Sequence, residues 1–177
     1  MSGPIILPYR NIVPRIDPTA FIAPGVVITG DVEIGPYANI WFNCVIRGDD
    51  APVRIGARAN IQDGCVLHVT FDGTERIPCV VGDDVAVGHM ALLHGCRLEA
   101  GAFIGMKAYV MDRAIVEGGA MVAAGAVVTP RKLVKSGELW AGTPARFSRR
   151  LKPEEIDYIS WVPRHYAELA AEYPARV

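Results

Sequence analysis

Hydrophobic side chains recur along the chain with a period of six residues. From residue 16 the sequence divides into units such as IDPTAF, IAPGVV, ITGDVE and IGPYAN, each beginning with an aliphatic residue. A helix needs apolar residues at spacings of three and four, and an ordinary strand needs strict alternation, so neither explains the pattern. With a few insertions the leading positions are Ile16, Ile22, Ile28, Ile34, Ile40, Ile46, Ile55, Ile61, Leu67, Val81, Val87, Leu93, Leu98, Ile104, Val110, Val116, Val122 and Val128.

A second column of small or slim apolar residues accompanies the first, two positions before the next leading residue. Hexapeptides of this kind are typical of a parallel β-helix, in which short strands stack through backbone hydrogen bonds. We therefore expect an all-β solenoid, and the repeat resembles the left-handed, triangular hexapeptide-repeat β-helix. Three hexapeptides per coil imply about six coils. The second column is Ala20, Val26, Val32, Ala38, Cys44, Ala59, Cys65, Cys79, Val85, Ala91, Cys96, Ala102, Ala108, Ala114, Ala120 and Ala126.

The end of the chain has a different pattern. Pro153, Glu154 and Glu155 are typical of a helix start, and an apolar stripe at helical spacing follows, with Pro163 expected to kink or split the helix. The predicted organisation is an N-terminal extension over 1–15, a left-handed β-helix over 16–130, a connecting segment over 131–151 and a C-terminal helix over 152–177 that packs on the β-helix.

Composition and charge narrow the function classes. Hydrophobic residues make up 51% of the chain, and 18 basic against 19 acidic side chains give a formal net charge of -1. This balance argues against nucleic acid or an anionic membrane as a partner. The sequence has neither an apolar run of about 18 residues nor a secretory signal, so we expect a cytoplasmic protein without a membrane span. All four cysteines fall in the small inward column, which favours core packing over zinc binding or disulfides.

Two histidines occupy equivalent positions of successive coils. With three units per coil, Ile46, Leu67 and Leu93 lead the third face of successive coils. His68 and His94 directly follow Leu67 and Leu93, as Arg47 follows Ile46 one coil earlier. Their side chains should point outward with backbones about 4.8 Å apart, close enough to share one metal ion. His89 belongs to the second face, so a third ligand is better supplied by another subunit, and closed symmetry makes a trimer the natural assembly. Taken singly, each histidine is also explained as a solvated polar residue.

The sequence resembles the gamma-class carbonic anhydrases. The motifs that carry the resemblance lie in order between residues 39 and 151: NIWFNCVIRGDDAPVRIG, ANIQDGCVLH, VGHMALLHGC, IGMKAYVMD and AGTPARFSRRL. The resemblance implies a homotrimer with zinc at each interface, bound by His68 and His94 of one chain and His89 of its neighbour. Metal-bound hydroxide would hydrate carbon dioxide reversibly to bicarbonate. Iron and cobalt are alternative metals for a three-histidine site.

The resemblance also implies roles for residues around the metal. Gln62 would orient the bound solvent or bicarbonate, and Asn60 would support it. Ion pairs of Arg47, Asp49 and Asp63 would set the interface, although Asp and Gly also form β-helix corners. Asp50 stands where the resemblance suggests a proton-carrying glutamate. The segment VTFDGTERIP after His68 is short, and its acids Asp72 and Glu75 are alternative carriers.

Other functions remain open at this stage. Hexapeptide acyltransferases use a histidine base and bind coenzyme A between subunits, and a metal-dependent acyl-CoA thioesterase would use the same activated water. A metal-binding homologue with little activity and a non-enzymatic scaffold are further alternatives. Three clustered histidines favour metal-assisted hydration or hydrolysis over acyl transfer.

Overall fold

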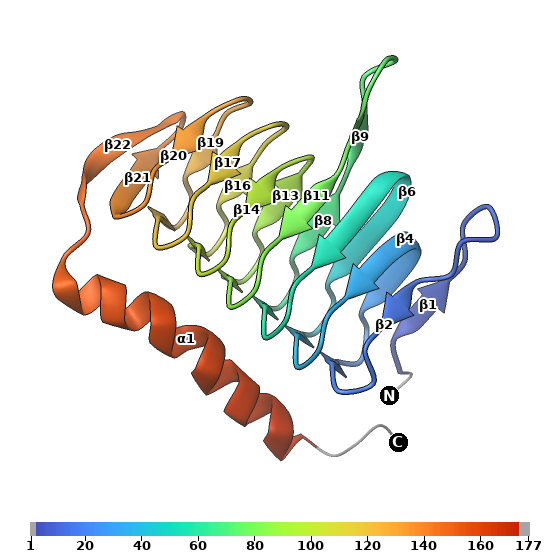
Figure 1. Ribbon diagram of the computed structural model, residues 1–177. Helices are drawn as coiled ribbons and strands as arrows, with labels where there is room; N and C mark the ends of the chain where they lie inside the picture. Colours follow the sequence, from blue (N-terminus) through green and yellow to red (C-terminus); the bar gives the residue numbers. More distant parts are fainter. Residues whose placement is uncertain (1–2, 174–177) are drawn as a thin grey trace.

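Each hexapeptide forms a short strand followed by a corner, and successive coils stack into a triangular parallel β-solenoid (Figure 1). The computed structural model describes residues 3–173. The predicted fold class, a left-handed β-helix with a C-terminal helix, is confirmed. Corners place residues such as Lys107 and Arg113 in the left-handed backbone region, with φ of 58° and 59°. These corners turn the chain by one face of the triangle within two or three residues.

Two faces join into one sheet because two long strands pass around a corner from the third face to the first. These are β4 (Val27–Ile34) and β6 (Val45–Ile55). The other third-face strands are β1 (Ile5–Leu7), β8 (Val66–His68), β13 (Leu92–His94), β16 (Tyr109–Val110) and β19 (Val127–Val128). The other first-face strands are β2 (Arg15–Ile16), β11 (Cys79–Val81), β14 (Arg97–Leu98), β17 (Ile115–Val116) and β20 (Leu133–Val134).

The second face is an eight-stranded sheet, parallel except at its last strand. It consists of β3 (Phe21–Ile22), β5 (Asn39–Ile40), β7 (Asn60–Ile61), β12 (Ala86–Val87), β15 (Phe103–Ile104), β18 (Met121–Val122), β21 (Glu138–Gly142) and β22 (Ala145–Arg150). β22 runs antiparallel to β21 at the C-terminal end of the stack. A hairpin of β9 (Thr70–Phe71) and β10 (Arg76–Ile77) projects away from the coils (Figure 1).

The two predicted columns form the core. Every small-column residue is buried, and so is every leading residue except Ile16, which is half-buried on the first coil. The four cysteines are free and buried among these residues, which confirms their assignment to the core. The interior is therefore a continuous column of aliphatic side chains packed against small ones.

Parallel pairing extends beyond residues 16 and 130, the predicted limits of the β-helix. β1 pairs with β4 within the predicted extension, and β20 and β21 pair with β17 and β18 within the predicted connecting segment. A coil satisfies its backbone groups on the coil next to it whatever its side chains are, so stacking continues where the hexapeptide pattern weakens. The solenoid consequently has more turns than the expected six.

The helix α1 (Pro153–Glu172) starts where the sequence predicts and runs back along the second face, against β5, β7 and β12 (Figure 1). Residues 1–2 and 174–177 of the predicted extension and helix lie outside the described residues. Pro163 does not split the helix. It is buried, and Arg164 Nε donates to the Ser160 carbonyl oxygen at 2.9 Å near the point where the proline removes a backbone donor.

The start of α1 is tied to the solenoid by one carboxylate. Glu155 accepts hydrogen bonds from both terminal nitrogens of Arg149, at 2.7 and 2.8 Å, and from the backbone N–H of Lys152 at 2.9 Å. The hydrogen bonds from Arg149 are the main reason that the pKa of Glu155 falls to about 2. This contact connects the last strand of the solenoid to the first turn of the helix.

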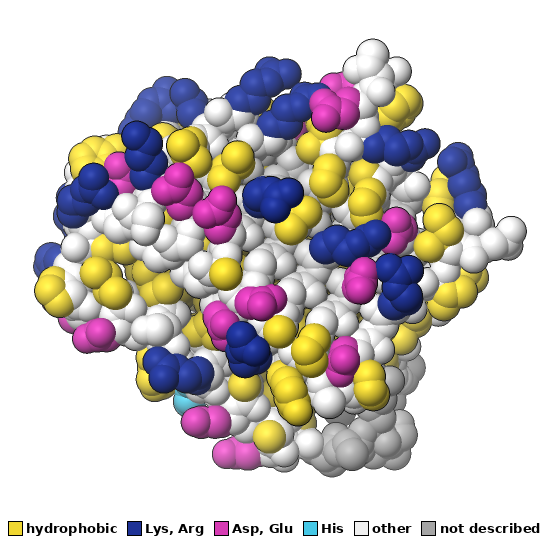
Figure 2. Space-filling model, in the orientation of Figure 1, with side chains coloured by type: hydrophobic (Ala, Val, Ile, Leu, Met, Phe, Trp, Pro, Cys, Tyr) yellow, Lys and Arg dark blue, Asp and Glu magenta, His cyan; other side chains and the backbone are white. Residues whose placement is uncertain are grey.

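The charged side chains on the surface are mixed in sign, as the near-neutral net charge of the sequence leads one to expect. On the face shown in Figure 2, basic and acidic side chains are intermixed with hydrophobic ones. Within residues 3–173, no helix combines the length and the apolar character that a bilayer crossing requires.

We predict that the core includes β20. Val134 is fully buried, whereas its neighbour Leu133 points outward and is 41% exposed. Val134→Ala should lower the free energy of unfolding by roughly 2 kcal/mol, because two methyl groups leave the core and a cavity remains. Leu133→Ala is the matched control and should change it by less than about 0.5 kcal/mol. Denaturant unfolding measures the free energy of unfolding of both variants. Equal effects would show that residues 131–151 only link the β-helix to the C-terminal helix and add nothing to the core.

We also predict that Glu155 gives the protein an acid-dependent stability. Its pKa is lowered from a usual 4.5 to about 2, so its contribution is complete above pH 4.5 and is lost as the pH falls toward 2. Glu155→Gln should lower stability at neutral pH and flatten the pH profile across this window. Glu154→Gln, in the same turn but outside the Arg149 contact, should leave the profile unchanged. Unfolding followed by helix ellipticity at several pH values gives the comparison.

Candidate metal site

The stacking register brings His68 and His94 together. Both residues end third-face strands, β8 and β13, and are direct partners in the parallel ladder, as predicted from the repeat. Each follows a fully buried leucine, Leu67 or Leu93, so each imidazole points outward from the solenoid. Nδ1 of His68 lies 3.2 Å from Nε2 of His94, and the ring centroids are 5.1 Å apart.

A carboxylate engages the other nitrogen of each ring. Asp49 Oδ1 lies 3.0 Å from His68 Nε2, and Asp112 Oδ1 lies 2.6 Å from His94 Nδ1. Each carboxylate favours a proton on the nitrogen that it faces, so in neutral rings the lone pairs of the two remaining nitrogens converge. Two nitrogens on a tetrahedral zinc ion, at bonds of about 2.05 Å, are separated by roughly 3.3 Å. The pair therefore fits a metal ion.

Burial and neighbouring charges keep His68 neutral, as a metal ligand must be. Burial lowers the pKa of His68, and the Arg47 charge adds to this effect, while the Asp49 hydrogen bond opposes it with a net lowering. Burial alone would raise the pKa of Asp49, but its hydrogen bonds with His68 and Arg47 outweigh burial and lower it. A neutral imidazole beside an ionised carboxylate is the state that a metal ligand requires.

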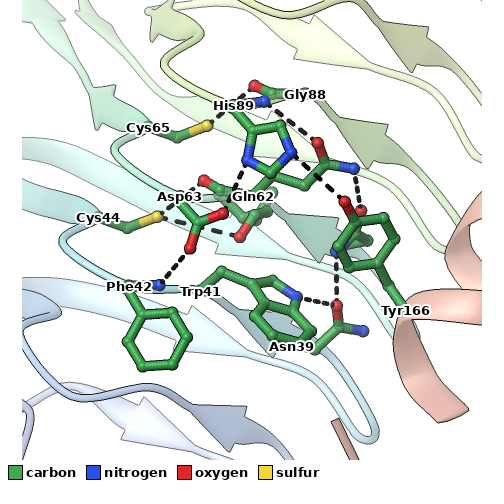
Figure 3. Close-up of polar contacts among 12 residues, drawn as sticks. Asn39, Trp41, Phe42, Cys44, Gln62, Asp63, Cys65, Gly88, His89 and Tyr166 are labelled. Carbon is green, nitrogen blue, oxygen red and sulfur yellow. Dashed lines mark hydrogen bonds and ion pairs between the residues drawn. The ribbon is translucent and has the colours of Figure 1, made fainter. Parts of the chain in front are cut away.

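His89 lies on the second face, as predicted, in the corner after β12. Gly88 allows this corner to approach the next coil, because a Cβ there would lie 2.7 Å from the backbone nitrogen of Met106. His89 Nδ1 pairs with Asp63 Oδ2 at 2.7 Å, and His89 Nε2 lies 3.4 Å from the Tyr166 hydroxyl (Figure 3). In residues 3–173, no three His, Cys, Asp or Glu side chains converge into a metal-binding group.

The remaining predicted residues divide between the two faces. Gln62, Asn60 and Asp63 lie with His89: Gln62 Oε1 accepts from the His89 backbone N–H at 3.2 Å, and Gln62 Nε2 donates to Asn60 Oδ1 at 3.0 Å. Arg47 and Asp49 lie with the histidine pair of the third face and form an ion pair there.

Asp50 and the two acids of the β9–β10 hairpin, Asp72 and Glu75, belong to neither of these two clusters. The backbone N–H of Asp50 donates to Asp49 and its carbonyl oxygen accepts from Arg76. Asp72 and Glu75 each accept from Arg113 at 2.7 Å. The candidate residues thus form two separate clusters, one around His68 and His94 on the third face and one around His89 on the second.

Sequence reasoning missed Asp112 and Tyr166. Val110 pairs with Leu93 in the ladder, so the residue in register with His94 is Met111, and Asp112 lies one residue beyond it. The repeat alone therefore does not place Asp112 beside His94. Tyr166 belongs to the apolar stripe of α1, and only the docking of the helix on the second face reveals its contact with His89. Burial is the main cause that raises the pKa of Tyr166, with the Asp63 charge contributing, so its hydroxyl remains a donor at neutral pH.

The fold and the paired histidines define a hexapeptide-repeat β-helix protein with a metal-compatible site. Residues 14–48 match the family model described as bacterial transferase hexapeptide (six repeats). The chain is 43% identical over 171 residues to a carbonic anhydrase of Geobacillus kaustophilus, covering 97% of this chain and 92% of that protein. The chain belongs to the gamma carbonic anhydrase family.

Another relative carries a gamma carbonic anhydrase name, and a solved structure with a transferase name shares the fold. Mitochondrial gamma carbonic anhydrase 2 of Arabidopsis thaliana is 45% identical over 159 residues, which cover 89% of this chain and 57% of that protein. The chain thus spans less than two thirds of the length of this and two other Arabidopsis relatives. The crystal structure of a hexapeptide transferase family protein from Anaplasma phagocytophilum superposes with a TM-score of 0.91 at 44% identity, covering 96% and 98% of the two chains.

We predict that Asp112 tunes the metal affinity of His94. Asp112→Asn replaces an ionised acceptor with an amide that can present a donor to His94 Nδ1, and should weaken Zn²⁺ binding by about 10–100-fold. Asp84→Asn is the control, because Asp84 pairs with Arg58 away from the histidines. Competition with a chromophoric chelator measures both affinities. Equal affinity of the two variants would exclude this role.

Proposed function

We propose that the protein is a gamma-class carbonic anhydrase that hydrates carbon dioxide reversibly to bicarbonate in a homotrimer. Zinc is the proposed metal, bound by His68 and His94 of one subunit and His89 of the partner subunit. The observation that carries this proposal is the pair of imidazole nitrogens 3.2 Å apart, each with its other nitrogen engaged by a carboxylate. Membership of the gamma carbonic anhydrase family supports the same reaction.

The distribution of the ligands supports a ring of subunits. Two histidines lie on the third face and one on the second, so one chain carries two complementary parts of a three-histidine site. Contacts between unlike faces are heterologous, and three such contacts close into a ring around a threefold axis. Each interface of that ring would then complete one site.

The chain's own residues provide the remaining functions of the site. A divalent metal lowers the pKa of a bound water toward about 7, which is the chemistry that it supplies here. Asp63 holds the His89 ring so that Nε2 is available. Gln62 and Tyr166 line the same cavity as His89, and the Tyr166 hydroxyl lies 3.4 Å from His89 Nε2. Their amide N–H and hydroxyl would donate to an oxygen of carbon dioxide or bicarbonate bound there.

Hydration also releases one proton for each bicarbonate formed. We propose that Asp50 carries this proton, because its backbone groups are hydrogen-bonded while its carboxylate has no hydrogen-bond partner within residues 3–173. The hairpin acids are less suited to the task. Hydrogen bonds from Arg113 are the main cause that lowers the pKa of Asp72, and the same arginine also pairs with Glu75.

A second candidate function has its own observation. A cavity of about 470 Å³ lies between α1 and the second face, beside His89 and Gln62. Aromatic and aliphatic side chains, among them Phe103 and Trp161, form most of its wall. This volume is in the range of pockets for molecules much larger than carbon dioxide. Metal-dependent hydrolysis of an acyl thioester is therefore the alternative, and it would use the same activated water.

We predict measurable carbon dioxide hydration by zinc-reconstituted protein in a stopped-flow assay. His94→Ala should abolish it, because one of the converging ligands is lost, and the metal content should fall in parallel. Asp84→Asn is the control, since Asp84 pairs with Arg58 away from both ligand groups and the cavity.

Acyl-CoA hydrolysis is measured on the same samples. Hydration that is lost in His94→Ala and retained in Asp84→Asn supports the carbonic anhydrase proposal. Thioester hydrolysis without hydration would replace it with the alternative. Equal rates in wild type and His94→Ala would exclude both metal-dependent reactions.

A further inference from the structure

Three amide side chains form a buried ladder on the second face, leading to His89. Asn39 and Asn60 are direct partners of β5 and β7, and Gln62 lies two residues beyond Asn60. They are 1%, 0% and 6% exposed, respectively. Buried amides of this kind are stable only when their donors and acceptors are matched. The ladder therefore has a definite direction, which its two ends determine (Figure 3).

Both ends of the ladder can only donate. At one end the indole Nε1–H of Trp41 donates to Asn39 Oδ1 at 2.9 Å, and at the other the backbone N–H of His89 donates to Gln62 Oε1 at 3.2 Å. Between them, Asn60 Nδ2 donates to Asn39 Oδ1 at 2.6 Å and Gln62 Nε2 donates to Asn60 Oδ1 at 3.0 Å. Turning any one amide over would set two donors or two acceptors against each other.

This orientation of the amides leaves one N–H₂ group unpaired at the Asn39 end of the ladder and one N–H unused at the Gln62 end. Asn39 Oδ1 accepts two hydrogen bonds, while Asn39 Nδ2 is buried without a partner among the described residues. Retaining an unpaired buried donor is unfavourable, so the direction of the ladder is maintained against a local penalty. At the far end, Gln62 uses one N–H of Nε2 for Asn60. The second N–H of that nitrogen has no acceptor among residues 3–173, and Gln62 lines the cavity with His89 and Tyr166, so a ligand there could accept from it.

Trp41 also contacts Tyr166, which lines the cavity with Gln62 and His89. Its ring makes an edge contact with Tyr166, with centroids 5.3 Å apart and an interplanar angle of 82°. Trp41 is 5% exposed and also packs against Phe21 at 5.2 Å. One buried indole thus contacts Tyr166 directly and is connected to Gln62 through Asn39 and Asn60.

We propose that Trp41 and Asn39 are positioning residues that hold the Gln62 amide with its N–H toward an anionic oxygen of the ligand bound beside His89. The ligand class is an oxyanion such as bicarbonate. This inference rests on the proposed function for the identity of the ligand. The direction of the ladder is independent of the reaction and can be tested without it.

The first test measures hydrogen exchange at the backbone amide of His89. Asn39→Leu removes the acceptor of Trp41 and Asn60 and should speed this exchange by roughly fivefold, the effect of losing about one hydrogen bond. Asn39→Asp keeps an oxygen acceptor for both donors and should restore slow exchange. Phe21→Leu is the packing control, since it alters a ring beside Trp41 without touching the ladder. Wild-type exchange in Asn39→Leu, or equal acceleration in Phe21→Leu, would overturn the inference.

The second test asks whether the ladder acts through Gln62. Bicarbonate affinity of the zinc-loaded protein is measured by calorimetry for wild type, Asn39→Leu, Trp41→Phe, Gln62→Ala and the Asn39→Leu/Gln62→Ala double variant. Asn39→Leu and Trp41→Phe should weaken binding severalfold, whereas Asn39→Leu should have no further effect in the Gln62→Ala protein. Independent, multiplicative losses would contradict the proposal. A protein with normal exchange behaviour, normal bicarbonate binding and no hydration would refute the proposed reaction and leave the ladder supported.

Discussion

The backbone register between stacked coils is the constraint on which the rest of the structure depends. Parallel strands about 4.8 Å apart place equivalent positions of successive coils directly above one another. One residue after a buried leucine, this register makes His94 the neighbour of His68, and it places Asn60 on Asn39 on the next face. The aliphatic column holds the coils in phase, so each polar contact of the site derives from the packing of the core. A change of register by one residue would turn these side chains inward and remove both groups at once.

The two faces carry different parts of the proposed metal site. The third face offers two imidazoles whose free nitrogens converge, oriented by Asp49 and Asp112. The second face offers His89, held by Asp63, together with the amide ladder and the Tyr166 hydroxyl. Neither part is sufficient for a three-ligand metal site, and a solenoid cannot bend one face onto another. Assembly with other copies of the chain is the proposed way to bring the parts together, and α1 contributes a wall and a hydroxyl to the second part.

Much of this arrangement was predictable because the repeat determines position. The hexapeptide phase predicted the solenoid, the burial of the cysteines, the stacking of His68 on His94 and the separate face of His89. It did not predict the contact of Tyr166, since that depends on how an amphipathic helix docks on a distant face. Nor did it predict the direction of the amides, which depends on the donor-only indole of Trp41. The limits of the solenoid were misplaced because backbone pairing continues where the side-chain pattern fades. An interruption at Pro163 did not occur because packing against the solenoid outweighs the loss of one backbone hydrogen bond.

Subunit mixing tests the shared metal site most directly. His89→Ala and His94→Ala chains, each purified alone, should retain no specifically bound zinc. If the two are unfolded and refolded together in equal amounts, every mixed trimer should contain one interface with all three histidines intact, so that about one quarter of all sites recover metal. We expect recovery of that fraction. Full zinc binding by either variant alone, or no recovery in mixed trimers, would contradict a site assembled between subunits.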